Sequence, residues 1–508
     1  MRVKTLQILW HDKEPIFSVD FEPNGAGRFA TAGGDHNVRV WKLAKDDHDL
    51  PVVQYLASLT RHAEAVNCVR WAPNGGTLAS AGDDGSILLW QQTEQKEGAA
   101  FGEQEDGALE TWRVAHILRG GTAAIYDIAW SPDASYIISA CIDNTSRLFD
   151  VKEQRCIEGL ADHGHFVQGV AWDPLGRYFV SQSSDRSLNV YTYEYKKSSI
   201  QVKLAGRQTK LDLAKCASRG ENAKTEKRIS PVTDENSAPN SCNNDSKAPS
   251  KAFRLFHDET LTSFFRRLTF SPDGALLFAP AGVYRSDAEA GENRNAVHIY
   301  GRGRILSQPL IYLPGNSKPS IAVRCSPVTY KLRNIRPDGP VSPPPVTSQP
   351  ANRSPIPPPV SLFALPYRYM YAVACQDALV IYDTQQLDPL AYISGLHYAT
   401  LTDLAWSSDG CTLLMTSTDG FCSVVSFDEG ELGERANVVV SKTIGEVMNT
   451  PPTSPPRAVP MEVDKPSVLV GQPTMQMKRD ADKPGPEAPE KKKRRIAPTF
   501  LGVAAPGK

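Results

Sequence analysis

Residues 66–90 read VNCVRWAPNGGTLASAGDDGSILLW, and this stretch decides the fold of most of the chain. Apolar and polar residues alternate up to Trp71, as in a half-buried β-strand. A Pro-Asn-Gly-Gly turn follows, because proline fixes φ and asparagine and glycine tolerate positive φ. A strand of small residues, a second turn at residues 82–85 and a strand ending at Trp90 complete the unit. The stretch therefore predicts three short strands joined by turns, with a variable fourth strand outside them.

The same signature recurs along the first 430 residues. Each copy begins with an aromatic residue followed by a turn, at Phe21, Trp71, Trp130, Trp172, Phe270 and Trp406. An aspartate stands thirteen or fourteen residues after five of these aromatics, at Asp35, Asp84, Asp143, Asp185 and Asp419. A large aromatic follows four of the aspartates by six residues, at Trp41, Trp90, Phe149 and Tyr191. Self-similarity at a period of ~40–45 residues with this content is the WD-repeat pattern, in which each repeat forms one four-stranded propeller blade.

His62, Ser80, Asp84 and Trp90 occupy positions where WD repeats place a side-chain hydrogen-bond network. We expect the equivalent aspartates and aromatic, Asp35, Trp41, Asp143, Asp185 and Asp419, to serve the same purpose. A buried histidine and aspartate are tolerated only when they satisfy each other. A Ser-His-Asp catalytic triad is the alternative, but a triad occurs once per enzyme and this set recurs, so we interpret it as structural. The third repeat has Gly120 and Gly121 where Gly-His is expected, which predicts an incomplete network there.

Seven blades are expected, at residues 14–45, 60–95, 118–153, 163–196, 255–303, 318–384 and 397–428. The fifth lacks an aspartate in register and is recognised from strands at 264–270 and 296–300. The sixth is recognised from strands at 369–374 and 377–382. We expect residues 1–10 to supply the outer strand of the last blade, which closes the ring and removes exposed sheet edges. The fold class is thus all-β, a seven-bladed WD40 β-propeller over residues 1–430.

Two insertions and a tail depart from the repeat. Residues ~197–250 are rich in Lys, Ser, Asn and Asp and predict a disordered insertion. Residues 334–360 carry two Pro-Pro-Pro runs and predict a stiff, polyproline-like loop without a fixed fold. We expect a disordered, Pro-rich linker at 431–490, followed by a basic motif at 491–502.

Composition narrows the functional class. The net charge of −1 argues against bulk nucleic-acid binding. The nine scattered cysteines form no Cys-x-x-Cys pair, which favours a reducing compartment without disulfides or structural zinc. We find no ~20-residue apolar run, signal-peptide pattern, phosphate-binding loop or metal-ligand spacing. The sequence therefore predicts a non-enzymatic protein with no cofactor, metal, membrane segment or small-molecule substrate.

The densest charge run lies in the tail. It comprises Lys491, Lys492, Lys493, Arg494 and Arg495, and the basic pair Lys478 and Arg479 stands eleven residues upstream. This spacing is the bipartite nuclear-import pattern and predicts an import receptor as partner and the nucleus as location. A merely solvated tail and unspecific nucleic-acid contact are the alternatives.

The residues after the cluster suggest a second role. Residues 496–501 are apolar and β-prone, which suits an extended segment that adds to the sheet edge of a partner while Arg494 and Arg495 pair with carboxylates. Thr450 and Ser454 each precede proline and are candidate phosphorylation sites, where a phosphate would add nearly two negative charges.

The propeller closely resembles the middle, WD-repeat subunit of chromatin assembly factor 1, the replication-coupled histone deposition complex. The resemblance covers nearly all of residues 1–430. It is carried by residues 10–21, 167–176, 256–258, 263–268, 279–282, 365–368 and 379–386. The tail at 493–501 resembles the family's B-domain motif, which docks on the histone chaperone anti-silencing function 1. By that resemblance Arg494 and Arg495 pair with acidic chaperone residues, and Ile496, Pro498 and Leu501 fill its apolar groove.

The resemblance implies a scaffold that joins the large and small subunits of the complex and helps to deposit histones H3 and H4, held indirectly through the chaperone, on newly replicated or repaired DNA. A replication-independent histone regulator of the HIRA type and a ubiquitin-ligase substrate receptor are the rivals. Exposed aromatic and Arg residues would anchor the large subunit. Phe264, Phe265, Arg266 and Arg267 are candidates, although strand packing is the favoured role for the two phenylalanines.

Overall fold

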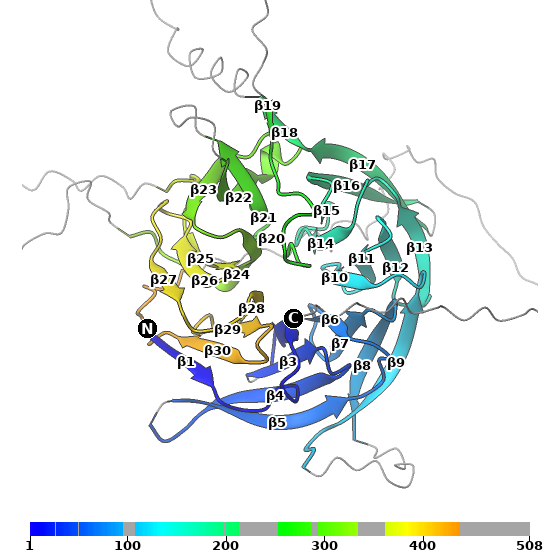
Figure 1. The fold of residues 1–508 in the computed structure, drawn as a ribbon, viewed down its shortest axis with the longest axis vertical. Coiled ribbons are helices and arrows are strands. Elements are labelled where there is room, and N and C mark those ends of the chain that lie inside the picture. Colours follow the sequence, from blue (N-terminus) through cyan, green and yellow to red (C-terminus); the bar gives the residue numbers. More distant parts are fainter. Residues whose placement is uncertain are drawn as a thin grey trace, which may run out of the picture. The chain divides into compact units, whose positions relative to one another are not determined.

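The computed structural model describes residues 1–436 except 26, 49, 95–106, 197–198, 213–251, 286–292 and 334–360. Within this part, seven four-stranded antiparallel sheets stand as blades around a central axis (Figure 1). The described residues contain one short 3-10 helix, Arg302–Arg304. The predicted all-β propeller of seven blades is confirmed.

In blades one to four the strands run from the axis outward in chain order. Blade one holds β2 (Ile16–Phe21), β3 (Arg28–Gly33), β4 (Val38–Lys45) and β5 (Pro51–Leu59). Blade two holds β6 (Val66–Trp71), β7 (Thr77–Gly82), β8 (Ser86–Thr93) and β9 (Thr111–Arg119). Blade three holds β10 (Ile125–Trp130), β11 (Tyr136–Cys141), β12 (Ser146–Asp150) and β13 (Arg155–Leu160). Blade four holds β14 (Val167–Trp172), β15 (Tyr178–Ser183), β16 (Ser187–Lys196) and β17 (Ser199–Gln208).

Blades five to seven are less regular. Blade five holds β20 (Thr269–Phe270), β21 (Leu276–Arg285), β22 (Asn293–Gly301) and β23 (Ile311–Asn316). Blade six holds β24 (Ser320–Tyr330), β25 (Arg368–Cys375), β26 (Ala378–Asp383) and β27 (Ala391–Ser394). Blade seven holds β28 (Leu401–Trp406), β29 (Thr412–Ser417), β30 (Cys422–Ser426) and β1 (Arg2–Leu6). A two-stranded ribbon, β18 (Lys210–Asp212) and β19 (Ala252–Arg254), lies between blades four and five in the chain.

The hydrophobic core lies between the blades. It consists of seven clusters, and each joins two neighbouring blades. In one of them Val38 and Val40 of blade one pack with Trp71, Leu78 and Trp90 of blade two. Because each face of a blade is buried against a neighbour, the inner strands are largely buried, and β6 is buried at every position, including the polar residues Asn67 and Arg70.

The N-terminal strand closes the ring. Figure 1 shows β1 beside β30, and the two pair antiparallel with Val3 opposite Val425. The strand ends at Leu6, earlier than the expected residue 10. Trp10 then turns inward, and its ring centroid lies 4.9 Å from that of Trp41. This pairing satisfies the edge of β30 that an open ring would expose.

Three expected boundaries are wrong. Residues 199–212, placed in a disordered insertion, form β17 and β18, because the apolar side chains at Ile200 and Val202 pack on blade four as in a half-buried strand. The expected inner strand at 264–270 is reduced to Thr269–Phe270. Residues 431–436, assigned to the linker, lie on the propeller, where Tyr330 and Arg435 form an antiparallel bridge. The expected loop at 334–360 lies outside the described residues.

We predict that Leu6→Ala lowers the free energy of unfolding by about 2–3 kcal/mol, because this side chain of the closing strand is buried between the last and first blades. Chemical denaturation would measure the loss. Lys4→Ala is the matched control, since Lys4 lies in the same strand and is exposed. Equal stability of the two variants would contradict a packing role for the strand.

Candidate functional site

Four blades hold a histidine between an aspartate and a hydroxyl group. In blade two, His62 Nδ1 lies 2.8 Å from Asp84 Oδ2, and Nε2 lies 2.7 Å from Ser80 Oγ. Trp90 Nε1 donates a hydrogen bond to the same hydroxyl at 2.8 Å. The equivalent sets are His11, Asp35, Thr31 and Trp41 in blade one, His163, Asp185 and Ser181 in blade four, and His397, Asp419 and Ser423 in blade seven.

Blade three uses a different arrangement. Gly121 stands at the histidine position, and a Cβ atom there would lie 3.0 Å from Arg147 Nη2. Arg147 instead forms an ion pair with Asp143, and Thr145 Oγ1 donates to the same carboxylate at 2.6 Å. Arg147, from the third strand β12, thus takes the place of the missing histidine. Its side chain occupies the space beside Gly121.

The hydroxyl groups of these networks, on Thr31, Ser80, Ser181 and Ser423, are all fully buried. Ser80 is fully buried, and its hydroxyl contacts both His62 and Trp90, so a substrate cannot reach it. Burial would raise the pKa of Asp84, but the hydrogen bond and charge of His62, together with two hydrogen bonds from Ser86, outweigh this effect and hold the pKa well below its usual range. Among the residues described, no three His, Cys, Asp or Glu side chains are arranged to hold a metal ion, and no helix is long and apolar enough to cross a membrane.

A second polar site, the central ionic cluster, fills the axis of the propeller. Its core consists of three arginines and two aspartates, Arg70, Arg267, Arg324, Asp127 and Asp403. Asp403 accepts a hydrogen bond from Arg70 at 2.8 Å and one from Arg324 at 3.2 Å. Arg267 donates to Asp127 at 3.0 Å, and both side chains are buried. The arrangement is a network of charges that pair with one another.

All seven blades contribute a group to this cluster. Blades one, two, three and four provide the Ser18 hydroxyl, Arg70, Asp127 and the backbone N–H of Val170. Blades five, six and seven provide Arg267, Arg324 and Asp403. Burial would raise the pKa of Asp403, but Arg267, Arg70 and Arg324 hold it well below its usual range. The aspartate is therefore a buried anion that three cations share.

Our sequence reasoning missed this cluster, although a signal was present. Six of the seven repeats have a turn aromatic, and the residues three positions before it are Ser18, Cys68, Asp127, Gly169, Arg267 and Asp403. Charges of both signs at one repeat position of an inner strand indicate side chains that converge on the axis. Arg266 and Arg267 are candidate anchors from the sequence, but both are fully buried, so neither can contact a partner. Of the four candidate anchors only Phe264 is exposed, at 59%.

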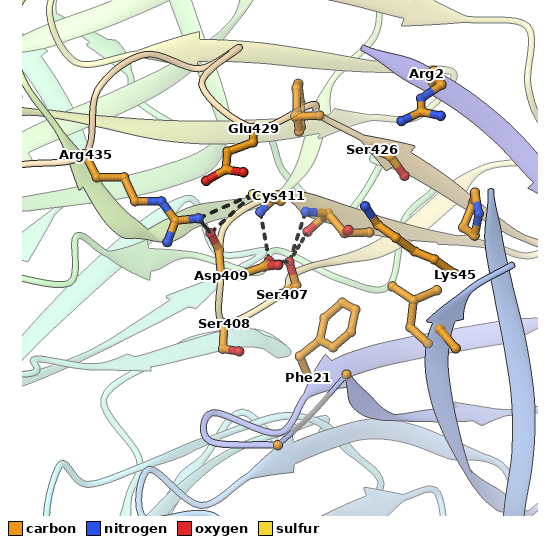
Figure 2. A pocket seen from close by; sticks show the side chains of 17 residues that line it. Arg2, Phe21, Lys45, Ser407, Ser408, Asp409, Cys411, Ser426, Glu429 and Arg435 are labelled. Carbon is orange, nitrogen blue, oxygen red and sulfur yellow. Dashed lines mark hydrogen bonds between the residues drawn. The ribbon is translucent and has the colours of Figure 1, made fainter. Parts of the chain in front are cut away.

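A cleft of about 520 Å³ lies where the first and last blades meet (Figure 2). Phe21, Leu43 and Phe427 give it an apolar lining, and Asp409 and Arg435 are among its polar groups. Arg435 Nη2 donates to the Asp409 carbonyl at 2.8 Å, so the last described residues help to shape the cleft.

The predicted tail sites lie outside the described residues. They are the chaperone-binding residues Arg494, Arg495, Ile496, Pro498 and Leu501, the import cluster from Lys478 to Arg495, and the phosphorylation candidates Thr450 and Ser454. The residues predicted for the blade networks, by contrast, all lie within the described part of the chain.

The histidine networks of the blades, the central ionic cluster and the closing strand define a WD-repeat β-propeller, a class that usually serves as a platform for partners. The family described as the CAF1B/HIR1 beta-propeller domain matches residues 1–215 and 215–432. The B subunit of chromatin assembly factor 1 from Gallus gallus is 37% identical over 93% of this chain and 80% of its own length. The Saccharomyces cerevisiae protein of the same name is 39% identical over 86% of this chain and 88% of its length. The chain belongs to the family of chromatin assembly factor 1 B subunits.

The other branch of the propeller family is more distant. Protein HIR1 of Gibberella zeae is 28% identical over 82% of this chain, which corresponds to only 34% of the HIR1 length. Both identity and coverage thus separate this chain from the HIR1 proteins.

We predict that Asp84→Asn destabilises the propeller by about 1–3 kcal/mol at pH 7, because His62 loses a charged partner. The folded-state pKa of Asp84 lies below its unfolded value, so this stabilisation is present above the unfolded pKa and is lost as the pH falls through the folded pKa. Denaturation at several pH values should show the variant and the wild type converging as the pH falls below about 4. A constant difference across this range would refute the charge-based explanation.

We predict a larger loss for Asp403→Asn, about 3–5 kcal/mol, because three buried arginines lose a shared counter-ion. Calorimetric melting would measure it. Asp47→Asn removes an exposed aspartate and is the control for loss of one negative charge. A melting temperature that is the same for both variants would mean that the central ionic cluster does not stabilise the ring.

Proposed function

We propose that this chain is a non-enzymatic scaffold protein of a chromatin assembly factor 1 complex that helps to deposit histones H3 and H4 on newly replicated or repaired DNA. The observation that carries the proposal is the match to chromatin assembly factor 1 relatives over most of both chains, which includes the mouse protein at 39% identity. The closed propeller supports it, because its polar networks are buried inside the ring and its outer surface is available to partners. The large and small subunits of the complex are the proposed partners of this surface.

The tail would serve as the chaperone dock. Arg494 and Arg495 would form charge-assisted pairs with carboxylates of anti-silencing function 1, and Ile496, Pro498 and Leu501 would occupy an apolar groove. Histones H3 and H4 would then reach the complex through the chaperone. The same basic run, with Lys478 and Arg479, would bind an import receptor and direct the protein to the nucleus. Arg494 and Arg495 would therefore contact the import receptor and the chaperone at different times.

A HIRA-type role is the second candidate from the same propeller family. The lower identity of HIR1 proteins and their much greater length favour the assembly factor. A ubiquitin-ligase receptor has no support among the relatives named above.

We predict that a peptide of residues 486–508 binds purified anti-silencing function 1 with micromolar or tighter affinity in calorimetric titration. An Arg494→Ala, Arg495→Ala, Ile496→Ala peptide should lose this binding, because both ion pairs and the first apolar contact are removed. Lys478→Ala and Arg479→Ala in a longer peptide form the control, since they would affect import alone. No binding by the native peptide would reduce the cluster to an import signal.

A further inference from the structure

Blade five departs from the repeat at its inner strand. In the six other blades this strand has six or more residues, but β20 consists of Thr269 and Phe270 only. The preceding residues 257–268 form no strand, and Arg267 makes one isolated parallel bridge to Ala322 of blade six. The side chain of Gln168 in blade four donates to the Ser263 carbonyl, and that of Gln376 in blade six donates to Thr262. The segment thus spans from one neighbouring blade to the other.

Arg266 fixes the backbone of this segment through hydrogen bonds. Its side chain is fully buried and donates to the carbonyl oxygens of His257 at 2.5 Å and Asp258 at 2.6 Å. Burial lowers the pKa of Arg266 to about 10. On the other side, a Cβ atom at Gly169 would lie 1.9 Å from the Arg266 carbonyl oxygen, so only glycine permits the close approach to β14. These contacts fix the backbone of the segment, so its exposed side chains have a defined geometry.

The segment presents an aromatic cluster, the aromatic mouth, formed by Phe17, Tyr126, Phe264 and Phe265. The ring centroids of Phe17 and Phe265 lie 6.0 Å apart, and those of Tyr126 lie 6.0 Å from Phe264 and 6.3 Å from Phe265. Phe265 is buried and rests on the Arg267 guanidinium, whose carbon lies 4.3 Å from the ring centroid. Phe264 is the exposed member, Phe17 and Tyr126 are half-buried, and the Arg267 side chain that contacts Phe265 belongs to the central ionic cluster.

Three exposed carboxylates lie on segments that form or contact the aromatic mouth. Asp83 lies close enough to Tyr126 to contribute to the raised pKa of that phenol, which is mainly due to burial. Glu259 lies in the same segment as Phe264, and Asp377 follows Gln376, which contacts Thr262. Asp83, Glu259 and Asp377 are all exposed. Arg186, which contacts the segment, is already paired with Asp258.

We propose that the aromatic mouth docks an extended, positively charged segment of a partner protein. An arginine or lysine side chain would lie over the Phe264 or Tyr126 ring, where the face of the ring attracts a cation. Neighbouring basic residues would pair with Asp83, Glu259 and Asp377, while an apolar side chain covers the rest of Phe264. The same carboxylates would repel phosphate groups, which disfavours nucleic acid. The proposal is independent of the tail and of its chaperone.

The test uses the full chain and fluorescence anisotropy with a short labelled peptide in which lysine and arginine alternate with alanine around one central leucine. We expect binding that weakens with salt, because the pairs are exposed. Phe264→Ala should weaken it at least about tenfold, as expected of an interface anchor. The double variant Glu259→Lys, Asp377→Lys should reduce it further. All three positions are exposed, so the fold should be retained.

Two control variants match these changes. Tyr392→Ala removes an aromatic ring of similar exposure, 56%, from the outer strand β27, and Glu153→Lys reverses an exposed charge in the turn before β13. Neither should change the affinity by more than about twofold. Equal binding by Phe264→Ala and wild type, or preference for a peptide with glutamate at every basic position, would overturn the proposal. Tighter binding after neutralising residues 491–495 would also overturn it, because the chain's own tail would then be the occupant.

Discussion

The central ionic cluster is the constraint on which the propeller depends. The hydrophobic clusters join only neighbouring blades, whereas the central ionic cluster connects blades that are not neighbours in the ring. Arg70 of blade two reaches Asp403 of blade seven, and Arg267 of blade five reaches Asp127 of blade three and the Asn67 carbonyl of blade two. Buried charges are costly unless all are paired, so a ring without blade three or blade seven would leave buried arginines without Asp127 or Asp403. The cluster therefore favours one ring size and fills the axis.

The histidine networks stabilise the structure locally. Each ties the loop before an inner strand to the second or third strand of the same blade, so the loss of one affects that blade first. Blade three replaces its histidine with Arg147, which shows that the position needs a donor for the aspartate more than it needs an imidazole. Blade five gives up both the network and most of its inner strand. Blade six also has no histidine, so the short inner strand is the feature that distinguishes blade five. Such a departure from a repeat is expected where function has modified it.

Two surfaces follow from these constraints, and they lie at opposite ends of the inner strands. Phe17 stands near the start of β2 and belongs to the aromatic mouth, while Phe21 ends the same strand and lines the cleft between the first and last blades. The cleft includes groups from both ends of the described chain, such as Arg2 and Arg435. A rigid platform with two separated surfaces suits a protein that joins several partners, which agrees with the family to which the chain belongs.

The amino-acid sequence by itself determined the blade count, the closing strand and the histidine networks, because these depend on local turn chemistry and on a spacing that repeats. The composition of the chain also predicted two insertions. Ile200 and Val202 were wrongly assigned to one of them, because a single short strand gives a weak signal beside a polar segment. What only the tertiary structure decided is the environment of Phe264, Arg266 and Arg267. These nearby residues look alike in a strand pattern, yet Phe264 is exposed and the two arginines are buried. Arg267 donates to Asp127 of blade three and to the Asn67 carbonyl of blade two. Arg266 donates to the carbonyls of His257 and Asp258 in its own segment and to the Ser183 carbonyl of blade four. Contacts between residues so far apart in the chain arise only when the ring closes.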